Sequence, residues 1–485
     1  MAFQILSIAS QALAAQEVAL EVTGNNMANA TTPGYAVESV DLTENAPAAE
    51  GNMPSTLVGN GVSVTAVTRA TNAFLSASVN NQTSAVAYAT ALAQGLSEVQ
   101  NIFEEPQSGG LAEMMNQFSQ SWLNLSENPE SLSARQSVIQ DGQTLASTLN
   151  NMAASLTTEE ENVNQNIVSQ VQQINQYAAQ IAQLNQEIAN VSSSGQPPNE
   201  LLDQRDQLLT QLSQLTNIQY SQGPANSLDV YIGAHPLVTG TETYQIVLNQ
   251  VGVPNSSTGT DTFTAEQPVW ADNGAPVQVQ SGSLAGNIAL LYQQTVSGST
   301  AGPITPGYLT SYGQSLDALT NALVTAVNSY QESGYNLQGA SASSTPFFTP
   351  SGTTAGSISV NSSLTPDALA AASSANNPGD GSNAATIYNV LTNQQMTIGA
   401  STATLSAYYQ ALVGQVGLDG QNANNLESDG QSTLTSLTND LQSATGVDLN
   451  QQAVNMIQEE QSYEAAAKLI STQQTVVQSL LAAVS

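Results

Sequence analysis

Residues 449–485 read LNQQAVNMIQEEQSYEAAAKLISTQQTVVQSLLAAVS, a stretch with neither glycine nor proline. Positions spaced alternately by four and three residues form a heptad pattern, and nine of the eleven are apolar. They are Leu449, Ala453, Met456, Glu460, Tyr463, Ala467, Ile470, Gln474, Val477, Leu481 and Val484. The pattern predicts one long amphipathic helix. Because an isolated helix is only marginally stable in water, this helix needs a partner.

Polar residues modify this helix at its start and along its seam. Asp448 precedes it and Gln451 follows three residues later, which predicts a capping box. Glu460 and Gln474 interrupt the apolar seam. We expect these two side chains to help set the register between neighbouring copies of the chain.

The overall composition is acidic but sparsely charged. Lys and Arg number 4 and Asp and Glu 37 among 485 residues, so the formal net charge is -33. Nucleic acids and anionic lipid surfaces require cationic partners, so both are excluded as ligands. Since only 8% of residues are charged, Gln, Asn, Ser and Thr must supply most of the polar surface. The absence of cysteine excludes disulfides and thiol catalysis.

Residues 1–20 lack the basic start of a secretory signal peptide, and Glu17 and several glutamines interrupt their apolar residues. The sequence contains no uninterrupted run of about 18 apolar residues, so we expect no membrane insertion. If the protein leaves the cell, it is expected to do so without a cleaved signal peptide.

A second heptad lies near the other end of the chain. Leu6, Leu13, Leu20 and Met27 are spaced by seven residues and predict a helix over about 3–27. A turn motif follows, made of Asn29, Thr32, Pro33, Gly34 and Tyr35. Pro33 presets the first φ of a tight turn, and Gly34 accepts a positive second φ. Alternating residues then predict strands over 37–42 and 59–69.

These features carry a family resemblance. The helix, the turn ending at Tyr35 and the Gly-Val-x-Val-x-x-Val-x-Arg-x-x-x-x-Phe-Leu run over 61–75 resemble the shared N-terminus of bacterial flagellar rod, hook and hook-associated proteins. Two positions depart from the family pattern. Asn72 stands where Asp is more common, and no basic residue follows Tyr35.

The middle of the chain is predicted to be largely helical. Apolar periodicity predicts helices over 71–103, 108–127, 130–143, 159–191 and 200–218. Glu159, Glu160 and Glu161 fit the first turn of a helix, and Asn199 fits an N-cap. Residues 192–199 break the pattern, which predicts an antiparallel helix hairpin. Further helices are predicted over 307–331, 383–412 and 422–443.

The second helix of the hairpin makes the family resemblance more specific. Its Leu-Leu-Asp-x-Arg-Asp-x-Leu-Leu run over 201–209 resembles the hook-associated protein 1 family of hook–filament junction proteins. We expect Arg205 in this run to form a structural ion pair beside the apolar seam. Alternating segments within about 225–290 predict a small β-rich insert, with a hairpin around Asn273-Gly274.

Together these elements predict a mainly α fold with a β-rich insert. Terminal coiled-coil helices pair with each other, an elongated helical domain is built from both halves of the chain, and a small β domain lies in the middle. The predicted boundaries are 1–70 with 445–485, 71–224 with 301–444, and 225–300.

The sequence offers little for catalysis. His235 is the one histidine, and no phosphate-binding loop or His/Cys metal set occurs, so no cofactor or metal is expected. Acidic pairs at 104–105, 159–161 and 459–460 leave a peptidoglycan-cleaving enzyme open as an alternative, because paired carboxylates hydrolyse glycosides. A non-enzymatic role is preferred.

The resemblance implies a structural subunit that joins hook to filament, with its paired terminal helices stacked as an inner tube around the export channel. It implies partners as well: copies of the chain, the hook protein, a second junction protein, and an export chaperone on the C-terminal helix. It implies type III export to an extracellular flagellum. Another axial subunit, such as the hook protein, is the alternative. The expected assembly interface comprises Leu6, Leu13, Leu20, Met27, Leu449, Ala453, Met456, Tyr463, Ala467, Ile470, Val477, Leu481 and Val484.

Overall fold

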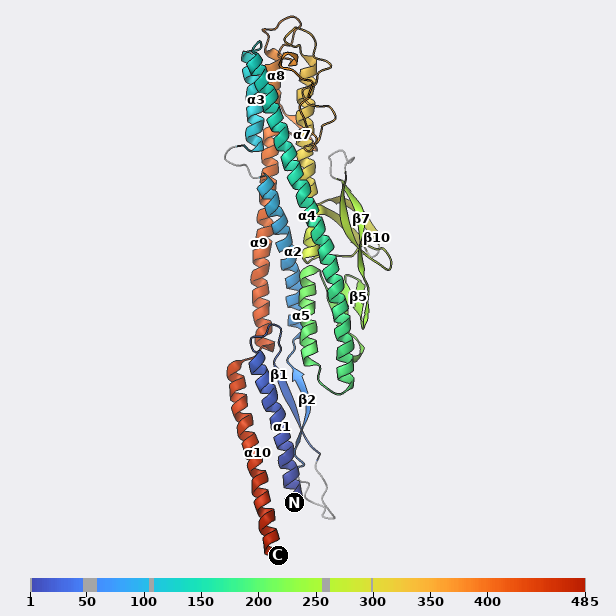
Figure 1. Ribbon diagram of the computed structural model, residues 1–485, viewed down its shortest axis with the longest axis vertical. Helices are drawn as coiled ribbons and strands as arrows, with labels where there is room; N and C mark the ends of the chain where they lie inside the picture. The colour runs from blue at the N-terminus through green and yellow to red at the C-terminus, as the bar shows by residue number, and fades with distance from the viewer. Residues whose placement is uncertain (1, 47–58, 104–108, 255–261, 298–299, 485) are drawn as a thin grey trace.

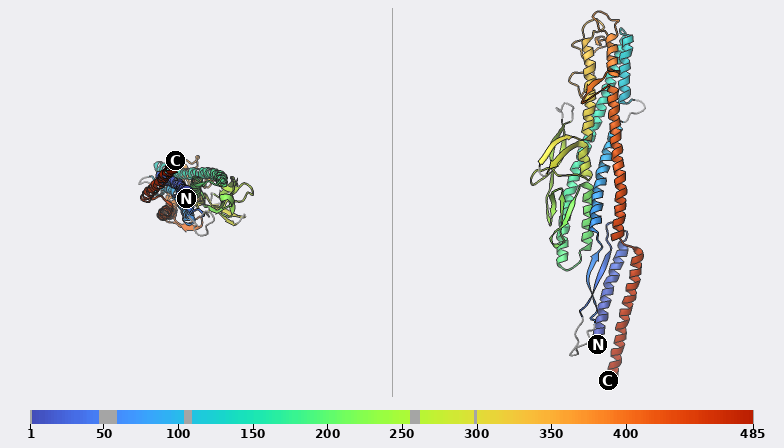
Figure 2. Two further views of the ribbon diagram at one scale, coloured as in Figure 1. Left: turned by 90° about the horizontal axis from the view of Figure 1, so that it is seen from below. Right: turned by 180° about the vertical axis from the view of Figure 1, so that it is seen from behind.

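A computed structural model describes residues 2–46, 59–103, 109–254, 262–297 and 300–484 (Figure 1). The described chain is long and narrow. One end, the terminal tier, holds both chain termini, and the other is a bundle of long helices, the helical body. A group of β-strands lies against one side of the helical body (Figures 1 and 2).

The terminal tier consists of two helices and one hairpin. Its elements are α1 (Ala2–Asn29), β1 (Glu38–Glu44), β2 (Val62–Arg69) and α10 (Leu449–Val484). Strands β1 and β2 pair antiparallel, with a bulge between Asp41 and Leu42. Helices α1 and α10 lie side by side, which confirms the predicted pairing of the two ends of the chain.

Only half of the predicted capping box forms at the start of α10. Asp448 Oδ1 accepts hydrogen bonds from the backbone N–H groups of Asn450 (2.8 Å) and Gln451 (3.3 Å). The Gln451 side chain does not return the bond but donates to Asn455 Oδ1 at 2.9 Å. Asp448 alone therefore caps the helix.

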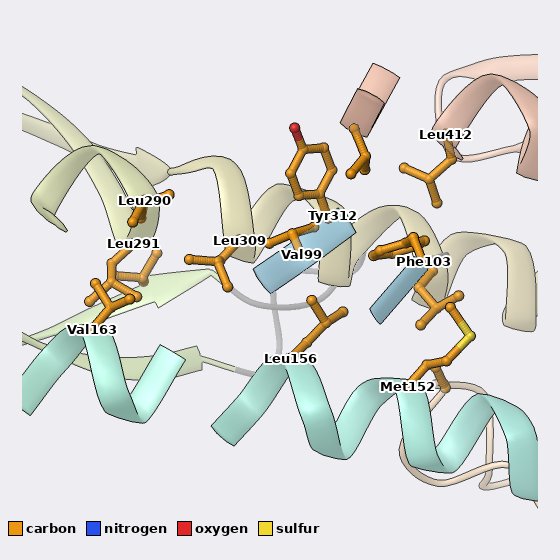
Figure 3. Close-up of a cluster of buried hydrophobic side chains, with 14 of the residues drawn as sticks. Val99, Phe103, Met152, Leu156, Val163, Leu290, Leu291, Leu309, Tyr312 and Leu412 are labelled. Carbon is orange, nitrogen blue, oxygen red and sulfur yellow. The ribbon is translucent and has the colours of Figure 1, made fainter. Parts of the chain in front are cut away.

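The helical body is built from segments distant in sequence. Its helices are α2 (Ala73–Phe103), α3 (Leu111–Glu127), α4 (Leu132–Ser193), α5 (Asn199–Leu215), α7 (Tyr308–Ser333), α8 (Ser382–Thr392) and α9 (Leu405–Thr445). Helices α2 and α9 run antiparallel along the middle of the molecule (Figure 1). The core collects side chains from α2, α4, α7 and α9, together with the short helix α6 (Ser283–Leu291) (Figure 3).

Two predicted helix boundaries are wrong. The helices predicted over 130–143 and 159–191 are one 62-residue helix, α4, because buried residues continue through the gap at Leu149, Met152 and Leu156. Glu159–Glu161 therefore lie in mid-helix, not in a first turn. Likewise α9 runs unbroken where a gap near 413–421 was predicted. The break comes earlier, within the helix predicted over 383–412, where the chain turns in a hairpin of β11 (Met396–Ile398) and β12 (Ser401–Ala403).

The helix hairpin of α4 and α5 forms as predicted, but Asn199 does not cap α5. Its side-chain amide instead donates to the Val67 carbonyl of β2 at 3.2 Å. The residue therefore ties the hairpin to the terminal tier.

The predicted β-rich insert is confirmed as a set of small antiparallel sheets. One sheet has the order β3 (Gln219–Gln222), β4 (Leu228–Ile232), β5 (His235–Thr239), β6 (Glu242–Thr243). The other pairs are β7 (Ile246–Pro254) with β8 (Thr262–Trp270), and β9 (Tyr292–Ser297) with β10 (Thr300–Pro306). Gly274 has φ +68°, as its turn requires, but only a single bridge, Val269–Pro276, follows there. The domain boundaries stay predictions.

Candidate assembly surface at the terminal helices

Small residues occupy the buried positions of α1. Ala9, Ala15, Ala19, Val22, Thr23 and Asn26 are buried. The predicted heptad lies less deep: Leu13, Leu20 and Met27 are half-buried, and Leu6 is 37% exposed. The contact of α1 with α10, β1 and β2 therefore uses mainly side chains that let backbones approach closely, and the larger ones are partly free.

The seam of α10 that faces α1 is rotated from the predicted one. Gln452 and Ala466 are buried, whereas the predicted seam residues Ala453 and Ala467 are exposed. Met456 and Ile470 belong to both seams and are half-buried. Two hydrogen bonds mark the contact: Thr23 Oγ1 donates to Glu459 Oε1 at 3.1 Å, and the Asn26 amide donates to Gln452 Oε1 at 3.3 Å.

Rotation of this seam leaves large apolar side chains of α10 uncovered. Those at least 39% exposed are Leu449, Val454, Ile457, Tyr463, Leu469, Val476, Val477 and Leu481. Ile5 and Leu6 are similarly exposed on α1. The side chain of Val484, also part of the predicted interface, lies outside the described residues. A concentration of exposed apolar side chains is typical of an interaction surface.

The predicted tight turn after α1 is confirmed. The Tyr35 N–H donates to the Thr32 carbonyl at 3.2 Å, and Gly34 has φ +81°, so Pro33 and Gly34 form a type II turn. Asn29 supports it by accepting from Thr32 Oγ1 at 3.1 Å. The turn docks on α5, where the Gln207 amide donates to the Pro33 carbonyl at 2.5 Å.

Asn26, which no sequence pattern singled out, connects the parts of the terminal tier. It is 1% exposed. Its Oδ1 accepts from Tyr35 Oη at 2.8 Å and from the Glu38 N–H at 2.9 Å, and its amide donates to the Glu38 carbonyl at 2.8 Å. A polar residue in line with the buried alanines of α1 is the signal that could have identified it.

Replacing Asn26 with alanine is expected to lower the stability of the terminal tier by about 2–3 kcal/mol, because partly buried groups of Tyr35 and Glu38 lose their hydrogen-bond partner. Hydrogen exchange of α1 and β1 in the purified subunit measures this loss. Asn425→Ala, at an exposed helical asparagine of α9, is the control. Equal exchange in the two variants would contradict the assigned role.

Arg69 joins the terminal tier to the helical body. Its Nη1 lies 2.6 Å from Asp203 Oδ1 and its Nη2 2.7 Å from Asp206 Oδ2, both on α5. Asp203 Oδ2 also accepts from the Ala36 N–H at 3.3 Å. Burial raises the pKa of Asp203, and the adjacent Arg69 offsets this only in part. The Leu-Leu-Asp-x-Arg-Asp-x-Leu-Leu run over 201–209 thus supplies two carboxylates that bind an arginine on β2.

The predicted ion pair of Arg205 is not seen among the described residues. Its Nη1 donates to Asn185 Oδ1 at 3.0 Å and to the Asn226 carbonyl at 2.8 Å. Burial lowers the pKa of this guanidinium. Arg205 points into the helical body, whereas Asp203 and Asp206 point to Arg69, so neighbours in one short run serve different contacts.

The candidate catalytic residues have structural surroundings. His235 stacks on Trp270 with ring centroids 4.0 Å apart, and its Nε2 lies 3.2 Å from Asp272 Oδ2. Glu160 is buried within α4, and Glu459 contacts Thr23. Glu104 and Glu105 lie outside the described residues. Within the described ranges, no group of three His, Cys, Asp or Glu side chains is placed to hold a metal.

Comparison with known proteins identifies the family. The model of the flagellar hook-associated protein FlgK helical domain matches residues 96–348. Flagellar hook-associated protein 1 of Bacillus subtilis (strain 168) is 30% identical over 504 residues, which cover 99% of this chain and 98% of that relative. The chain belongs to the flagellar hook-associated protein 1 family. Members of this family are structural proteins of the bacterial flagellum, outside the cell, at the hook–filament junction.

Other comparisons cover the ends of this hook-associated protein 1 family member. A flagella basal body rod protein model matches residues 6–35, and a flagellar basal body rod FlgEFG protein C-terminal model matches 442–483. The Salmonella typhimurium flagellar hook-associated protein 1 is 28% identical over 69% of this chain and 58% of its own length. The solved flagellar hook junction protein FlgK from Burkholderia pseudomallei, 17% identical, shares the fold, with a TM-score of 0.61 over 76% of this chain and all of that one.

One helix of the described residues, Ile5–Asn29, is long and apolar enough to cross a membrane by length and composition. The criterion of an uninterrupted apolar run did not find it. In this family member the same helix packs against α10, β1 and β2, and helices that pack within a soluble protein pass the same test.

Proposed function

We propose that this hook-associated protein 1 family member joins hook to filament by assembling with copies of itself through α1 and α10. The main observation in support is the set of large apolar side chains that lie exposed on these two helices in the described chain. Fully burying such a side chain contributes about 1.5–3 kcal/mol, and a half-exposed one roughly half of that. Eight on α10 alone can therefore contribute several kcal/mol to each contact between subunits.

The location of these helices supports an inner position in the assembly. They form one end of a long molecule, and the strands lie against the side of the helical body farther along it (Figure 2). We propose that stacked terminal tiers form an inner tube, with the helical body and strands outside it. The neighbours along that tube would be the hook protein at one end and a second junction protein at the other.

Export is proposed to follow the flagellar type III route without a cleaved signal peptide. The exposed apolar side chains of α10 would need protection before assembly, which supports a chaperone that covers this helix. A catalytic role is not proposed, because His235 and Glu459 are held in structural contacts.

The assembly proposal is tested with Ile457→Gln, Leu469→Gln and Val476→Gln combined. The variant is expected to stay monomeric in sedimentation where the unmodified subunit forms ordered polymers or binds hook ends, because several kcal/mol of apolar burial is lost. The control removes three exposed apolar side chains elsewhere, at Leu132, Val247 and Leu418. Loss of assembly in the control alone would point to a different surface.

Glu460 and Gln474 are exposed on α10, so neither is required for its contact with α1. Replacing both with leucine is expected to increase aggregation before assembly, because the change extends the exposed apolar surface and removes polar groups that define register. Light scattering during storage and electron microscopy of polymers measure the two effects. Unchanged solubility together with unchanged polymers would count against this role.

A further inference from the structure

Internal contacts occupy all three arginines of the chain. Arg69 binds Asp203 and Asp206, and Arg205 binds Asn185 and a backbone carbonyl. Arg135, 1% exposed, donates from Nε to the Pro129 carbonyl at 2.8 Å and from Nη1 to the Leu369 carbonyl at 2.6 Å. The remaining basic side chain, Lys468, is exposed on α10. The surface therefore has almost no cations to balance its carboxylates.

The terminal tier shows the same imbalance. Helix α1 carries Glu17 and Glu21, both exposed. Helix α10 carries Glu459, Glu460 and Glu464, and Asp448 caps its start. Strand β1, which packs on α1, adds Glu38, Asp41 and Glu44. Against these nine carboxylates stand Lys468 and Arg69, and the charge of Arg69 is already balanced by two aspartates of α5. Among the residues of this tier that the structure describes, Tyr35 and Tyr463 are the other titratable side chains.

One of the nine carboxylates lies in the seam between α1 and α10. Glu459 Oε1 accepts from Thr23 Oγ1, and its Oε2 is buried with no hydrogen-bond partner. Helix α1 contains no Lys, Arg or His, so it offers Glu459 no cation. A buried carboxylate oxygen without a donor is costly when ionised.

We propose that acid controls this self-assembly, an inference that rests on the function proposed above. At neutral pH and low ionic strength, carboxylates on the terminal tiers of two copies repel each other and keep subunits apart. Like charges that meet across an interface cost several kcal/mol, which can outweigh the apolar burial. Once the carboxylates are protonated, only the four Lys and Arg side chains and His235 remain charged, so acid does not replace negative repulsion with strong positive repulsion.

Purified subunit is titrated from neutral pH to about pH 4, near the ordinary pKa of carboxyls, at about 0.01 M ionic strength. Sedimentation and electron microscopy follow assembly, and circular dichroism checks that helix content is retained. The unmodified subunit is expected to be monomeric at neutral pH and to form ordered polymers in acid that dissociate when pH is restored. Addition of about 1 M salt at neutral pH is expected to reproduce part of the effect by screening.

Two matched variants locate the charges. Glu17→Gln, Glu21→Gln, Glu460→Gln and Glu464→Gln remove four exposed carboxylates from the terminal tier. This variant is expected to assemble at neutral pH and low salt, at a concentration at least about tenfold below the highest one at which the unmodified subunit is still monomeric. Glu127→Gln, Glu130→Gln, Glu242→Gln and Asp429→Asn remove the same charge outside the terminal tier and should leave the pH dependence unchanged.

The possible outcomes distinguish acid control from the self-assembly on which it rests. Ordered assembly of the unmodified subunit at neutral pH and low salt overturns acid control and leaves self-assembly standing. An equal shift in both variants overturns the role of the terminal tier and points to net charge alone. Failure to assemble under every condition, while helix content is retained, overturns self-assembly itself.

Discussion

Replacement of Arg69 by methionine is expected to destabilise the subunit by about 3–5 kcal/mol, the usual cost of removing one partner of a buried ion pair. The side chains of Arg69 and Asp203 are both 12% exposed, so Asp203 would be left as an uncompensated charge between β2 and α5. Asp206 is 47% exposed and contributes less, because water screens it. Urea unfolding measures the loss, and hydrogen exchange should place it in β2 and the turn at Tyr35.

A compensating variant tests the cause. Arg69→Met combined with Asp203→Asn and Asp206→Asn removes the charges of both sides and keeps an acceptor for the Ala36 N–H. Most of the lost stability is expected to return, because no unpaired carboxylate remains. If the triple variant is as unstable as Arg69→Met, the packing of the arginine stem, not its charge, holds the terminal tier to α5.

Replacement of Glu160 by glutamine is expected to stabilise the subunit by about 3 kcal/mol at about pH 8. Glu160 is 2% exposed on α4, one turn from Leu156 and from Val163, which face the core shown in Figure 3. Burial, together with the negative charges of Asp317 and Glu161, raises its pKa from 4.5 to about 7. The folded chain therefore resists ionisation of this carboxyl.

The sign of the pH dependence follows from that raised pKa. The unfolded chain loses the proton near pH 4.5, whereas the folded chain holds it until about pH 7. Stability is therefore highest below pH 4.5 and falls as the pH rises toward 7, after which the difference between Glu160 and glutamine is constant. Urea unfolding at about pH 4 and about pH 8 measures both limits. Glu161→Gln, at the exposed neighbour, keeps the buried Glu160 and should retain most of the fall in stability between about pH 4 and about pH 8, whereas Glu160→Gln should abolish it. Loss of the fall in Glu161→Gln would contradict the buried origin.

Repetitive local patterns were predictable from the sequence. The heptads of α1 and α10 predicted helices because an amphipathic helix needs only a period of 3.5–3.6 residues. The turn at Pro33-Gly34 was predictable because its geometry depends on the φ preferences of two adjacent residues. Asn26 was not identified, because its partners come from three other parts of the fold.

The corrections share one cause, which is competition between local signals and distant packing. Three glutamates at 159–161 suggested a helix start, yet core contacts on both sides of them keep α4 continuous. Asn199 suited an N-cap, but a carbonyl of β2 binds its side chain. Arg205 lies between Asp203 and Asp206 in sequence, but successive residues of a helix point about 100° apart. It therefore enters a different contact.

The sequence by itself determined the elements, the family resemblance and the pairing of the two ends of the chain. Only the tertiary structure decided which face of α10 meets α1. The predicted and observed seams share Met456 and Ile470, and elsewhere differ by one residue: Gln452 against Ala453, Glu459 against Glu460 and Ala466 against Ala467. A heptad pattern cannot distinguish these seams, because both repeat every seven residues. The observed seam places Glu459 and Gln452 where Thr23 and Asn26 of α1 donate hydrogen bonds to them, and it leaves the larger apolar side chains of α10 exposed.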